Sequence, residues 1–302
     1  SPDELFDLSM GILQLQERRV VRLFVRKDVY NRFISCLVYI PRDNYNSDLR
    51  QAIQGFLGKT FHALEASFDA RFSESVLARI HFIFRVDPKE RREFDFKQIE
   101  QRIIEIARTW RDDLRDCLIE HFGEEKGILL FGKYAQAFSV AYREDFHART
   151  AVLDIDHLER LTNDNLIEMT FYRLVDDSPD TLRFKIFHSH HTLALSDIVP
   201  MLENMGLRII GERPYQVNFG EEHSAWIHDF ILQHNNTNMD FDLAARLFQE
   251  AFAKVWYGVV ENDGFNKLVL NAQLNWRQVS ILRAYAKYLR QTGFMFSQQY
   301  IE

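Results

Sequence analysis

The hydrophobic and polar positions in the first half of the chain predict strands and helices in a definite order. Strands are recognised by alternation with a period of two, and helices by hydrophobic positions three and four residues apart. Residues 32–40 are apolar on both faces, which is typical of a central strand. The predicted elements are strands 18–26 and 32–40, a helix from about residue 49 that stops near Gly58, strands 63–72 and 77–86, and one long amphipathic helix over residues 99–117.

The second half repeats this order with different residues. Its first helix is expected to begin with Ser196 as the N-cap, because a hydroxyl can accept a bond from a free backbone N–H. Gly206 is expected to end the helix. The predicted elements are strands 166–175 and 182–187 with a turn between them, the helix just described, strands 207–217 and 224–232, and a helix over about 240–256.

A unit of two strands, a helix, two strands and a helix matches a ferredoxin-like α/β sandwich whose last strand has moved to the front. In such a sheet the strand after the first helix is an edge, and Pro214 agrees because Pro is confined to edges or bulges. We expect the first edge strand to turn Phe68 and Phe72 inward and to be paired or covered. We expect the second edge strand to be interrupted near Pro214. The prediction is an α+β fold of two such modules.

Helical patterns fill the connector between the modules and the tail, where Asn275 is a plausible N-cap. The predicted organisation is a lead-in over 1–17, a first module over 18–123, a helical connector over 124–164, a second module over 165–260 and a helical tail over 261–302.

Composition excludes several classes of protein. The net charge of −7 comes without a block of like charges, which argues against a nucleic-acid surface. No apolar run approaches the ~18 residues of a membrane span, and the first residues lack a basic secretory leader. Cys36 and Cys117 lie in apolar patterns and are expected to be buried thiols, not a disulfide. We therefore expect a cytoplasmic protein that binds neither nucleic acid nor membrane.

Three long stretches resemble one family. They are "FVRKDVYNRFISCLVYIPRDNYN", "LSDIVPMLENMGLRIIGERPYQV" and "NDGFNKLVLNAQLNWRQVSILRAYAKYLRQTGFMFSQQYIE". They closely resemble the amino-terminal, non-catalytic part of the large bacterial NAD-specific glutamate dehydrogenases, and the resemblance covers nearly the whole chain. It implies ACT-like modules, which are small ferredoxin-like units that bind amino acids and control assembly in many metabolic enzymes.

The resemblance also implies a homo-oligomeric parent enzyme that uses NAD to deaminate glutamate to 2-oxoglutarate and ammonia. Its catalytic region would follow this segment and be its partner. This chain has no G-x-G-x-x-G after a strand and no glycine-flanked lysine segment of the kind that the family uses. No catalytic residue, metal or cofactor site is therefore assigned to it, and NAD belongs to the parent enzyme.

Three histidines in four residues raise the possibility of a metal site. His188 continues the inward face of its strand, and His190 would follow it if the strand persisted. Zinc needs a third and fourth ligand or an open water, and His223, His228 and His234 could contribute only through the fold. A polar strand end is the favoured interpretation. His228, between Trp226 and Phe230 on a strand face, is expected to be buried and hydrogen-bonded.

The segment "GILLFGKY" imitates a phosphate-binding P-loop through Gly127, Gly132 and Lys133. Tyr134 stands where Ser or Thr would hold magnesium, and a phosphate cradle needs a flexible polar loop after a buried strand. Helices are expected to flank this segment instead, which disfavours a nucleotide site.

Ligands of ACT domains generally lie near the loop between a central strand and the first helix. The free N–H groups of a helix amino terminus can receive a carboxylate there. The candidate ligand-binding residues in the two loops are Arg42, Asp43, Asn44, His190, Thr192, Ser196 and Asp197. Plain helix capping is the alternative interpretation of both loops.

Three functions remain open from the sequence. The favoured one is a regulatory and assembly segment that binds an amino-acid effector between modules. The second is a purely structural oligomerisation scaffold with no small-molecule ligand. The third is a free-standing metalloenzyme, which would have to retain metal and turn over a substrate.

Overall fold

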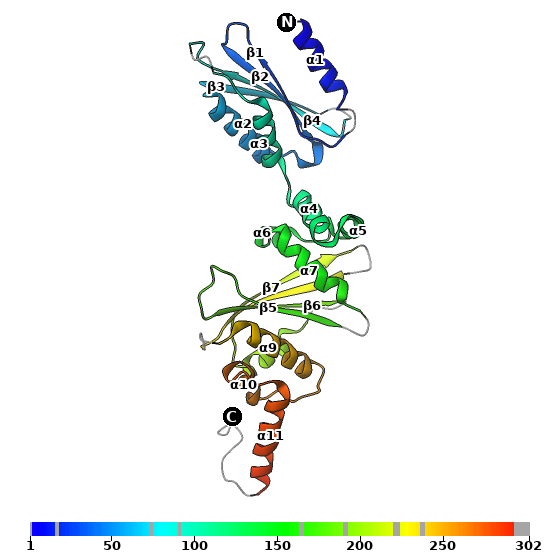
Figure 1. Cartoon of the computed structure of the whole chain (residues 1–302), viewed down its shortest axis with the longest axis vertical. Helices are drawn as coiled ribbons and strands as arrows, with labels where there is room; N and C mark the ends of the chain where they lie inside the picture. Colours follow the sequence, from blue (N-terminus) through cyan, green and yellow to red (C-terminus); the bar gives the residue numbers. More distant parts are fainter. Residues whose placement is uncertain are drawn as a thin grey trace. The chain divides into compact units, whose positions relative to one another are not determined.

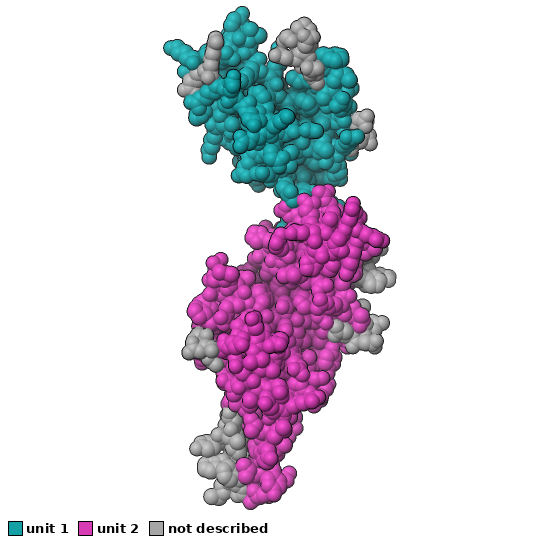
Figure 2. All heavy atoms as spheres, in the orientation of Figure 1, with its two compact units in different colours: residues 1–112 teal, residues 113–302 magenta. Residues whose placement is uncertain are grey.

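The computed structural model describes residues 2–15, 18–72, 75–89, 92–162, 166–189, 193–219, 224–235 and 239–292. The chain divides into two compact units, residues 1–112 and 113–302 (Figure 2). The sequence-based segmentation placed the end of the first module at residue 123. The compact units instead separate inside helix α4 (Trp110–Phe122), most of which belongs to the second unit.

The first unit is a four-stranded antiparallel sheet with helices. Its strands stand in the order β1-β2-β4-β3. Because β2 and β3 both run antiparallel to β4, they are parallel to each other with β4 between them, as the permuted ferredoxin-like pattern predicts. Its elements are α1 (Pro2–Leu13), β1 (Arg22–Lys27), β2 (Phe33–Pro41), η1 (Arg42–Asn44), α2 (Ser47–Phe61), β3 (Glu65–Phe72), β4 (Leu77–Arg85) and α3 (Phe96–Ala107).

Helices α2 and α3 cover one face of this sheet (Figure 1). Asp95 caps α3 by accepting bonds from two backbone N–H groups, and Ile99 and Ile103 then fall on the buried side of the helix. Alternate residues of the central strands meet them, and Cys36 among these is fully buried. Burial raises the pKa of the Cys36 thiol to about 12, so this cysteine is an inert apolar group at neutral pH.

The inward burial predicted for the edge strand β3 is wrong. Phe68 and Phe72 remain 46% and 50% exposed. They stand on the same face as the core residues of β4, but at the margin of the helix layer. There Phe68 meets the guanidinium of Arg50 and Phe72 meets the ring of Tyr45. Within the described part of the chain no strand pairs with the outer edge of β3.

The long helix predicted over residues 99–117 is two helices. The backbone is extended at Arg108, which ends α3, and Thr109 directly precedes α4. Thr109 and Asp112 exchange hydrogen bonds, because the Asp112 carboxylate accepts from the Thr109 N–H at 3.0 Å and the Thr109 hydroxyl accepts from the Asp112 N–H at 3.2 Å. This reciprocal arrangement starts a new helix, and a hydrophobic period alone does not reveal it.

The second unit repeats the sheet topology, with the strand order β5-β6-β8-β7. The α+β prediction of two modules is therefore confirmed. Its remaining elements are α5 (Glu124–Tyr134), α6 (Val140–Asp145), α7 (Ala148–Arg160), β5 (Ile167–Tyr172), β6 (Thr181–Ser189), α8 (Leu195–Asn204), β7 (Arg208–Asn218), β8 (Ser224–Gln233), α9 (Phe241–Trp256), η2 (Gly264–Lys267), α10 (Leu268–Asn271) and α11 (Trp276–Gln291).

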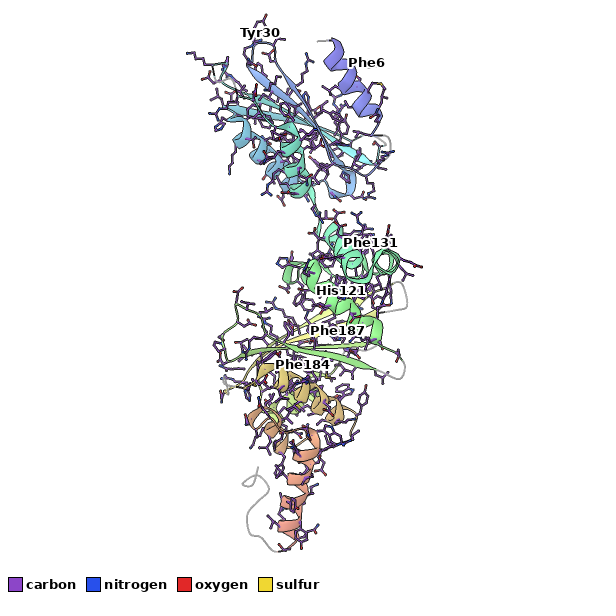
Figure 3. The ribbon with its side chains drawn as sticks, viewed as in Figure 1. Phe6, Tyr30, His121, Phe131, Phe184 and Phe187 are labelled. Atoms are coloured by element: carbon purple, nitrogen blue, oxygen red, sulfur yellow. The ribbon has the colours of Figure 1, made fainter. Side chains whose placement is uncertain are left out.

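Helices cover both faces of the second sheet (Figure 1). On one face the apolar side of α9 packs on β6, where Phe184 meets Phe248 and Phe252 with ring centroids 5.0 Å apart. On the other face α7 crosses the strands, and Phe187 stacks on His157 at 4.8 Å. Figure 3 shows Phe184 and Phe187 on opposite sides of the sheet. Both are fully buried.

The second edge strand is not interrupted at Pro214. The ladder of β7 with β8 continues through Pro214 opposite His228, and its irregularity lies between Ile209 and Gly211. An edge strand tolerates Pro because one of its two backbone edges needs no donor. Toward the end of β7 the Asn218 N–H donates to the Ala137 carbonyl at 2.9 Å, so part of this outer edge is covered.

The P-loop imitation is helical and is not a phosphate cradle. Gly127 and Gly132 both lie within α5. A Cβ on Gly127 would stand 2.7 Å from the Ile119 Cα of α4, whereas a Cβ on Gly132 would meet nothing within 4 Å. The first glycine therefore permits two helices to approach closely, and the second has no packing role.

These two glycines provide a matched test of the helix contact. Gly127→Ala is expected to lower the free energy of unfolding by roughly 1–3 kcal/mol, because backbone atoms of α4 must move. Gly132→Ala is expected to raise it by about 1 kcal/mol, because alanine is the better helix former. Urea unfolding followed by circular dichroism measures both, and equal effects of the two substitutions would contradict the packing.

Candidate functional site

The first loop predicted to bind a ligand forms the short helix η1 directly after β2. Asp43 is exposed and pairs with Arg19 at 2.6 Å. Neither Arg42 nor Asn44 caps the following helix, because Asn46 performs that role by accepting from the Leu49 N–H at 2.7 Å. A helix cap in this loop is therefore confirmed, but the capping residue is Asn46 and not one of residues 42–44. The role of residues 42–44 in ligand binding stays a prediction.

The second predicted loop is partly outside the described residues, which exclude His190, His191 and Thr192. Ser196 and Asp197 lie in the exposed first turn of α8. The prediction that Ser196 caps this helix is wrong. Ala194 occupies the N-cap position without a side-chain bond, and the Ser196 hydroxyl lies 3.5 Å from the Asp197 carboxylate instead.

The described histidines of the second sheet form a stacked pair. His188 and His228 are both 3% exposed, and their ring centroids lie 5.2 Å apart. The Nδ1 of His228 is 2.6 Å from the Glu212 carboxylate. The expectation of a buried, hydrogen-bonded His228 is thus confirmed. Among the residues that the structure describes, no three His, Cys, Asp or Glu side chains are grouped as metal ligands would be.

A buried charge network, which the sequence did not predict, joins the second sheet to its helical cover. Lys185 of β6 is 1% exposed and Asp154 of α7 is 3% exposed. The Lys185 Nζ donates to the Asp154 Oδ2 at 2.6 Å, and the Tyr142 hydroxyl donates to the same oxygen at 2.5 Å. Burial, with the neighbouring Asp154 carboxylate, raises the pKa of Tyr142, so this phenol stays a neutral donor.

Aromatic rings enclose the Lys185 ammonium. Its Nζ lies 3.8 Å from the centroid of the Phe146 ring and 5.6 Å from that of Tyr172. A cation over an aromatic face is stabilised by the ring quadrupole, more so away from water. The rings thus replace part of the hydration that burial removes from the ammonium.

A second carboxylate faces this lysine from the next strand. Asp229 of β8 is the cross-strand partner of Lys185 and accepts a bond from the Tyr172 hydroxyl at 2.9 Å. Burial raises the pKa of Asp229 above its ordinary value, although Lys185 and the Tyr172 bond oppose this. The two acids therefore differ, because the Asp154 carboxylate pairs directly with the Lys185 ammonium and the Asp229 carboxylate does not.

The network can hold the helices on the sheet, but its charged atoms are closed off from any substrate. Asp154 stands on the apolar side of α7, together with the buried Ala151, Ile155 and Leu158. An acid in the hydrophobic stripe of a helix was the one signal in the sequence that could have revealed the network. Such an acid must have a buried cation nearby, because an unpaired buried charge is too costly.

The chain matches four family models in succession. They are described as "Glutamate dehydrogenase, ACT2 domain" over residues 22–111, "Glutamate dehydrogenase, helical motif 2" over 117–161, "Glutamate dehydrogenase, ACT3 domain" over 166–245 and "Glutamate dehydrogenase, helical motif 3" over 260–302. The two ACT models fall on the two sheets, and the two helical motifs fall on α4–α7 and on the helices after α9.

Three similar proteins are named NAD-specific glutamate dehydrogenase. The protein of Halomonas elongata is 45% identical over 300 residues, which is 99% of this chain and 18% of that protein. The protein of Pseudomonas aeruginosa is 41% identical with the same coverage, and that of Mycobacterium tuberculosis is 34% identical over 100% of this chain and 19% of its own length. The chain spans about a fifth of the length of these curated relatives.

The asymmetry of the two buried acids can be tested with one type of substitution. Asp154→Asn leaves the buried Lys185 ammonium without its direct counter-charge, so we expect a loss of roughly 3–5 kcal/mol in the free energy of unfolding. Asp229→Asn keeps an acceptor for Tyr172 and removes a charge that burial disfavours, so a loss below about 1 kcal/mol is expected. Urea titration of both variants is the measurement, and a larger loss for Asp229→Asn would contradict this description.

The pH dependence of stability provides a second test. The pKa of Asp229 is raised in the folded protein, so the folded state binds more protons than the unfolded state between the ordinary and the raised value. The free energy of unfolding therefore falls as pH rises through that window. Asp229→Asn is expected to remove this decrease from a pH series of urea titrations.

Asp177 is the matched control, because its pKa is shifted in the opposite direction. The Arg183 guanidinium bonds both of its carboxylate oxygens, at 2.8 and 2.9 Å, and lowers the pKa of Asp177. Its contribution to stability is present above the ordinary pKa and is lost as pH falls through the lowered one. Asp177→Asn is thus expected to change the pH dependence of the free energy of unfolding in the direction opposite to Asp229→Asn. A change in the same direction for both variants would contradict the opposite pKa shifts of the two acids.

Proposed function

Since the chain belongs to the part of the glutamate dehydrogenase family that these ACT and helical-motif models describe, we propose that it is a regulatory and assembly segment of a cytoplasmic NAD-specific glutamate dehydrogenase. The parent enzyme would convert glutamate, NAD and water to 2-oxoglutarate, ammonia and NADH in a catalytic region outside these residues. The observation that carries this proposal is the order of the four models, which follows the sheets and helical groups of the structure one by one.

The assembly function rests on the last described helix. One side of α11 is anchored in the second unit, where the buried Arg283 donates to both carboxylate oxygens of Asp263 at 2.7 and 2.8 Å. An adjacent side carries a continuous apolar stripe that is 42–65% exposed. The stripe consists of Ile281, Leu282, Tyr285, Tyr288 and Leu289.

An exposed stripe of this kind marks a contact surface, because soluble proteins rarely leave contiguous apolar side chains open to water. We assign the contact to another region of the same long polypeptide. About four fifths of the length of each relative lies outside the part that this chain matches. A helix that is anchored on one side and apolar on the next is suited to receive such a region.

The regulatory function concerns the loops that precede α2 and α8. The exposed Arg42 and Asp43 of η1, and the exposed Ser196 and Asp197 in the first turn of α8, present charged and polar groups near these helix amino termini, where an amino acid could place its carboxylate. We retain an amino-acid effector at these loops as part of the proposal. A scaffold that holds subunits of a homo-oligomer together and binds no effector is the alternative.

The stripe can be tested by charge insertion. Tyr285→Glu with Tyr288→Glu is expected to change the stability of the 302-residue chain by less than about 0.5 kcal/mol, because both side chains are exposed. In the full-length gene product the same pair is expected to expose α11 to limited proteolysis and to reduce activity. Arg246→Glu, on the exposed side of α9 and with the same change of two charges, is the control.

Unchanged proteolysis of the full-length double variant would contradict the internal contact. A dimer of the 302-residue chain that dissociates in the double variant would instead assign the stripe to a second copy, and analytical ultracentrifugation distinguishes these outcomes.

The purified chain is expected to form no NADH from glutamate and NAD above a heat-killed control, because it lacks the glycine-rich dinucleotide turn. A thermal-shift screen against amino acids separates the two forms of the proposal. A ligand that binds only the folded state raises the melting temperature with concentration. Glutamate-dependent NADH formation by this chain would overturn the assignment of catalysis to another region, and an absence of any shift would favour the scaffold.

A further inference from the structure

The outer edge of β3 presents a row of backbone groups that has no strand beside it in the described part of the chain. β3 is the last strand in the order β1-β2-β4-β3, and it pairs with β4 without a register shift over its eight residues. It contains neither proline nor glycine. Natural proteins usually cover such an edge or interrupt it, because an open edge pairs with other strands. The edge of β3 is therefore suited to strand addition.

The corresponding edge of the second sheet is protected. β7 has a register irregularity between Ile209 and Gly211, and Pro214 removes a backbone donor. Toward its end Asn218 is bonded to Ala137. Each of these features hinders the addition of a strand. The same strand order thus occurs once with a protected edge and once with an unprotected one.

The even-numbered residues of β3 direct their backbone groups toward the open edge. In an antiparallel sheet, successive residues turn their N–H and C=O groups to alternate sides. The Val86 N–H donates to the Arg32 carbonyl at 2.9 Å, so the even-numbered residues of β4 are bonded to β2. The odd-numbered residues of β4 then bond to the odd-numbered residues opposite them on β3. The outward set on β3 is Ala66, Phe68, Ala70 and Phe72.

The sequence of β3 is complementary to itself when two copies run antiparallel. With a two-fold axis at Phe68, outward-facing residues of the two copies stand opposite each other and can exchange backbone bonds. Glu65 then stands opposite Arg71 of the second copy, and Ser67 stands opposite Asp69 of the second copy. Opposite charges on adjacent strands stabilise the pairing. The axis therefore creates two contacts between Glu65 and Arg71, one on each side of it.

The neighbouring registers are disfavoured by charge. An axis at Ser67 places Glu65 opposite Asp69 of the second copy, and an axis at Asp69 places this carboxylate opposite its own equivalent. Both registers keep outward-facing residues opposite each other, so backbone bonding does not distinguish them from the axis at Phe68. Charge does, because like charges directly opposite one another are destabilising.

The exposed side chains of β3 fit the same arrangement. On the helix side of the sheet Phe68 is 46% exposed, and the two-fold axis brings the Phe68 rings of the two copies together. Aromatic pairs across strands stabilise a sheet. On the other side Arg71 pairs with Asp69 at 2.8 Å, and both side chains are more than half exposed. The Arg71 guanidinium therefore remains accessible to Glu65 of the second copy.

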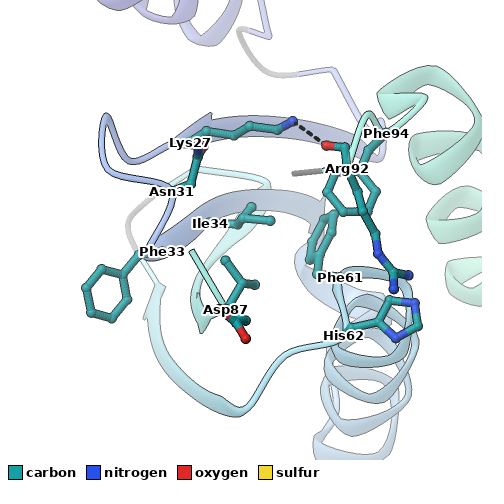
Figure 4. A pocket seen from close by; sticks show the side chains of 10 residues that line it. Lys27, Asn31, Phe33, Ile34, Phe61, His62, Asp87, Arg92 and Phe94 are labelled. Carbon is teal, nitrogen blue, oxygen red and sulfur yellow. Dashed lines mark hydrogen bonds between the residues drawn. The ribbon is translucent and has the colours of Figure 1, made fainter. Parts of the chain in front are cut away.

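The start of β3 is held in place by the end of α2. His62 closes α2 with φ 51° and ψ 45°, the left-handed conformation that often ends a helix. The adjacent Phe61 is 3% exposed and packs edge-on against Phe94, with ring centroids 5.1 Å apart. A pocket of about 220 Å³ borders this turn at the end of the sheet opposite to η1, with Lys27 and Arg92 on its rim (Figure 4). The edge strand is therefore preformed, and pairing does not have to order it first.

We propose that β3 pairs antiparallel with β3 of a second copy of this chain, around a two-fold axis at Phe68. The two four-stranded sheets of the first units then join into one sheet of eight strands. This contact is separate from the α11 stripe, which we assign to another region of the same polypeptide, and it depends neither on an effector nor on catalysis. Because one strand edge is a small interface, the 302-residue chain is expected to dimerise weakly.

Sedimentation equilibrium of the 302-residue chain, over a concentration series into the millimolar range, measures the dimer. Glu65→Arg and Arg71→Glu each turn both contacts between positions 65 and 71 into like-charge contacts, so each is expected to weaken association about tenfold. An equimolar mixture of the two variants is expected to restore association, because every such contact between unlike variants joins opposite charges. Mixing cannot rescue a variant that fails to fold, so this result separates pairing from stability.

Two controls leave β3 unchanged. Glu105→Arg on α3 removes an exposed carboxylate that also pairs with an arginine, Arg102, and it makes the same change of two charges. It is expected to leave the dimer intact. Tyr285→Glu with Tyr288→Glu is expected to leave the dimer intact as well, which distinguishes this contact from the α11 stripe.

Residue-resolved amide exchange provides an independent measurement. The outward N–H groups of Ala66, Phe68 and Ala70 are expected to exchange more slowly as the protein concentration rises. Those of Ser67 and Asp69 face β4 and are expected to be protected at every concentration.

Three results would overturn the proposal. One is that the chain stays monomeric at every concentration. Another is that Glu65→Arg dimerises as tightly as the unmodified chain, which would place the contact elsewhere. The last is that the mixture of Glu65→Arg and Arg71→Glu associates no more tightly than either variant alone.

Discussion

The burial of one lysine constrains the whole second unit. Lys185 stands at the centre of a sheet that is covered on both faces, so its ammonium has to find a counter-charge inside the protein. Asp154 provides it from α7, and Tyr142 and Phe146 complete the enclosure from the neighbouring helical segment. Helical motif 2 is therefore tied to the ACT3 sheet by a contact that apolar packing alone would not specify.

The two modules share a strand order but differ in how much of each sheet is covered by other elements. In the second unit, helices occupy both sides of the sheet, and part of the outer edge of β7 is bonded to Ala137. In the first unit β3 keeps its rings half exposed, and the opposite end of the sheet opens into a cationic pocket. The same strand order thus carries a sheet covered on both faces in the second unit and a partly exposed edge strand in the first.

The candidate site could be predicted only in part from the sequence, because its charged residues lie far apart along the chain. Arg42 and Asp197 were predicted from a place before a helix, and they lie in η1 and in the first turn of α8, but neither position shows whether side chains converge. Lys27 and His62 lie 35 residues apart and line one pocket only because β1 and α2 end on the same side of the first unit. Lys185 and Asp154 were missed for the same reason.

The sequence by itself determined the periodic elements, their repeated order and the edge positions of β3 and β7, because hydrophobic spacing and proline placement act over a few residues. It also determined the capping box of Asn275, which is formed by residues next to one another. Only the tertiary structure decided that Phe68 stays exposed and that Lys185 is buried. Each of these depends on which surface another element covers, and that is a property of contacts between residues far apart in the chain.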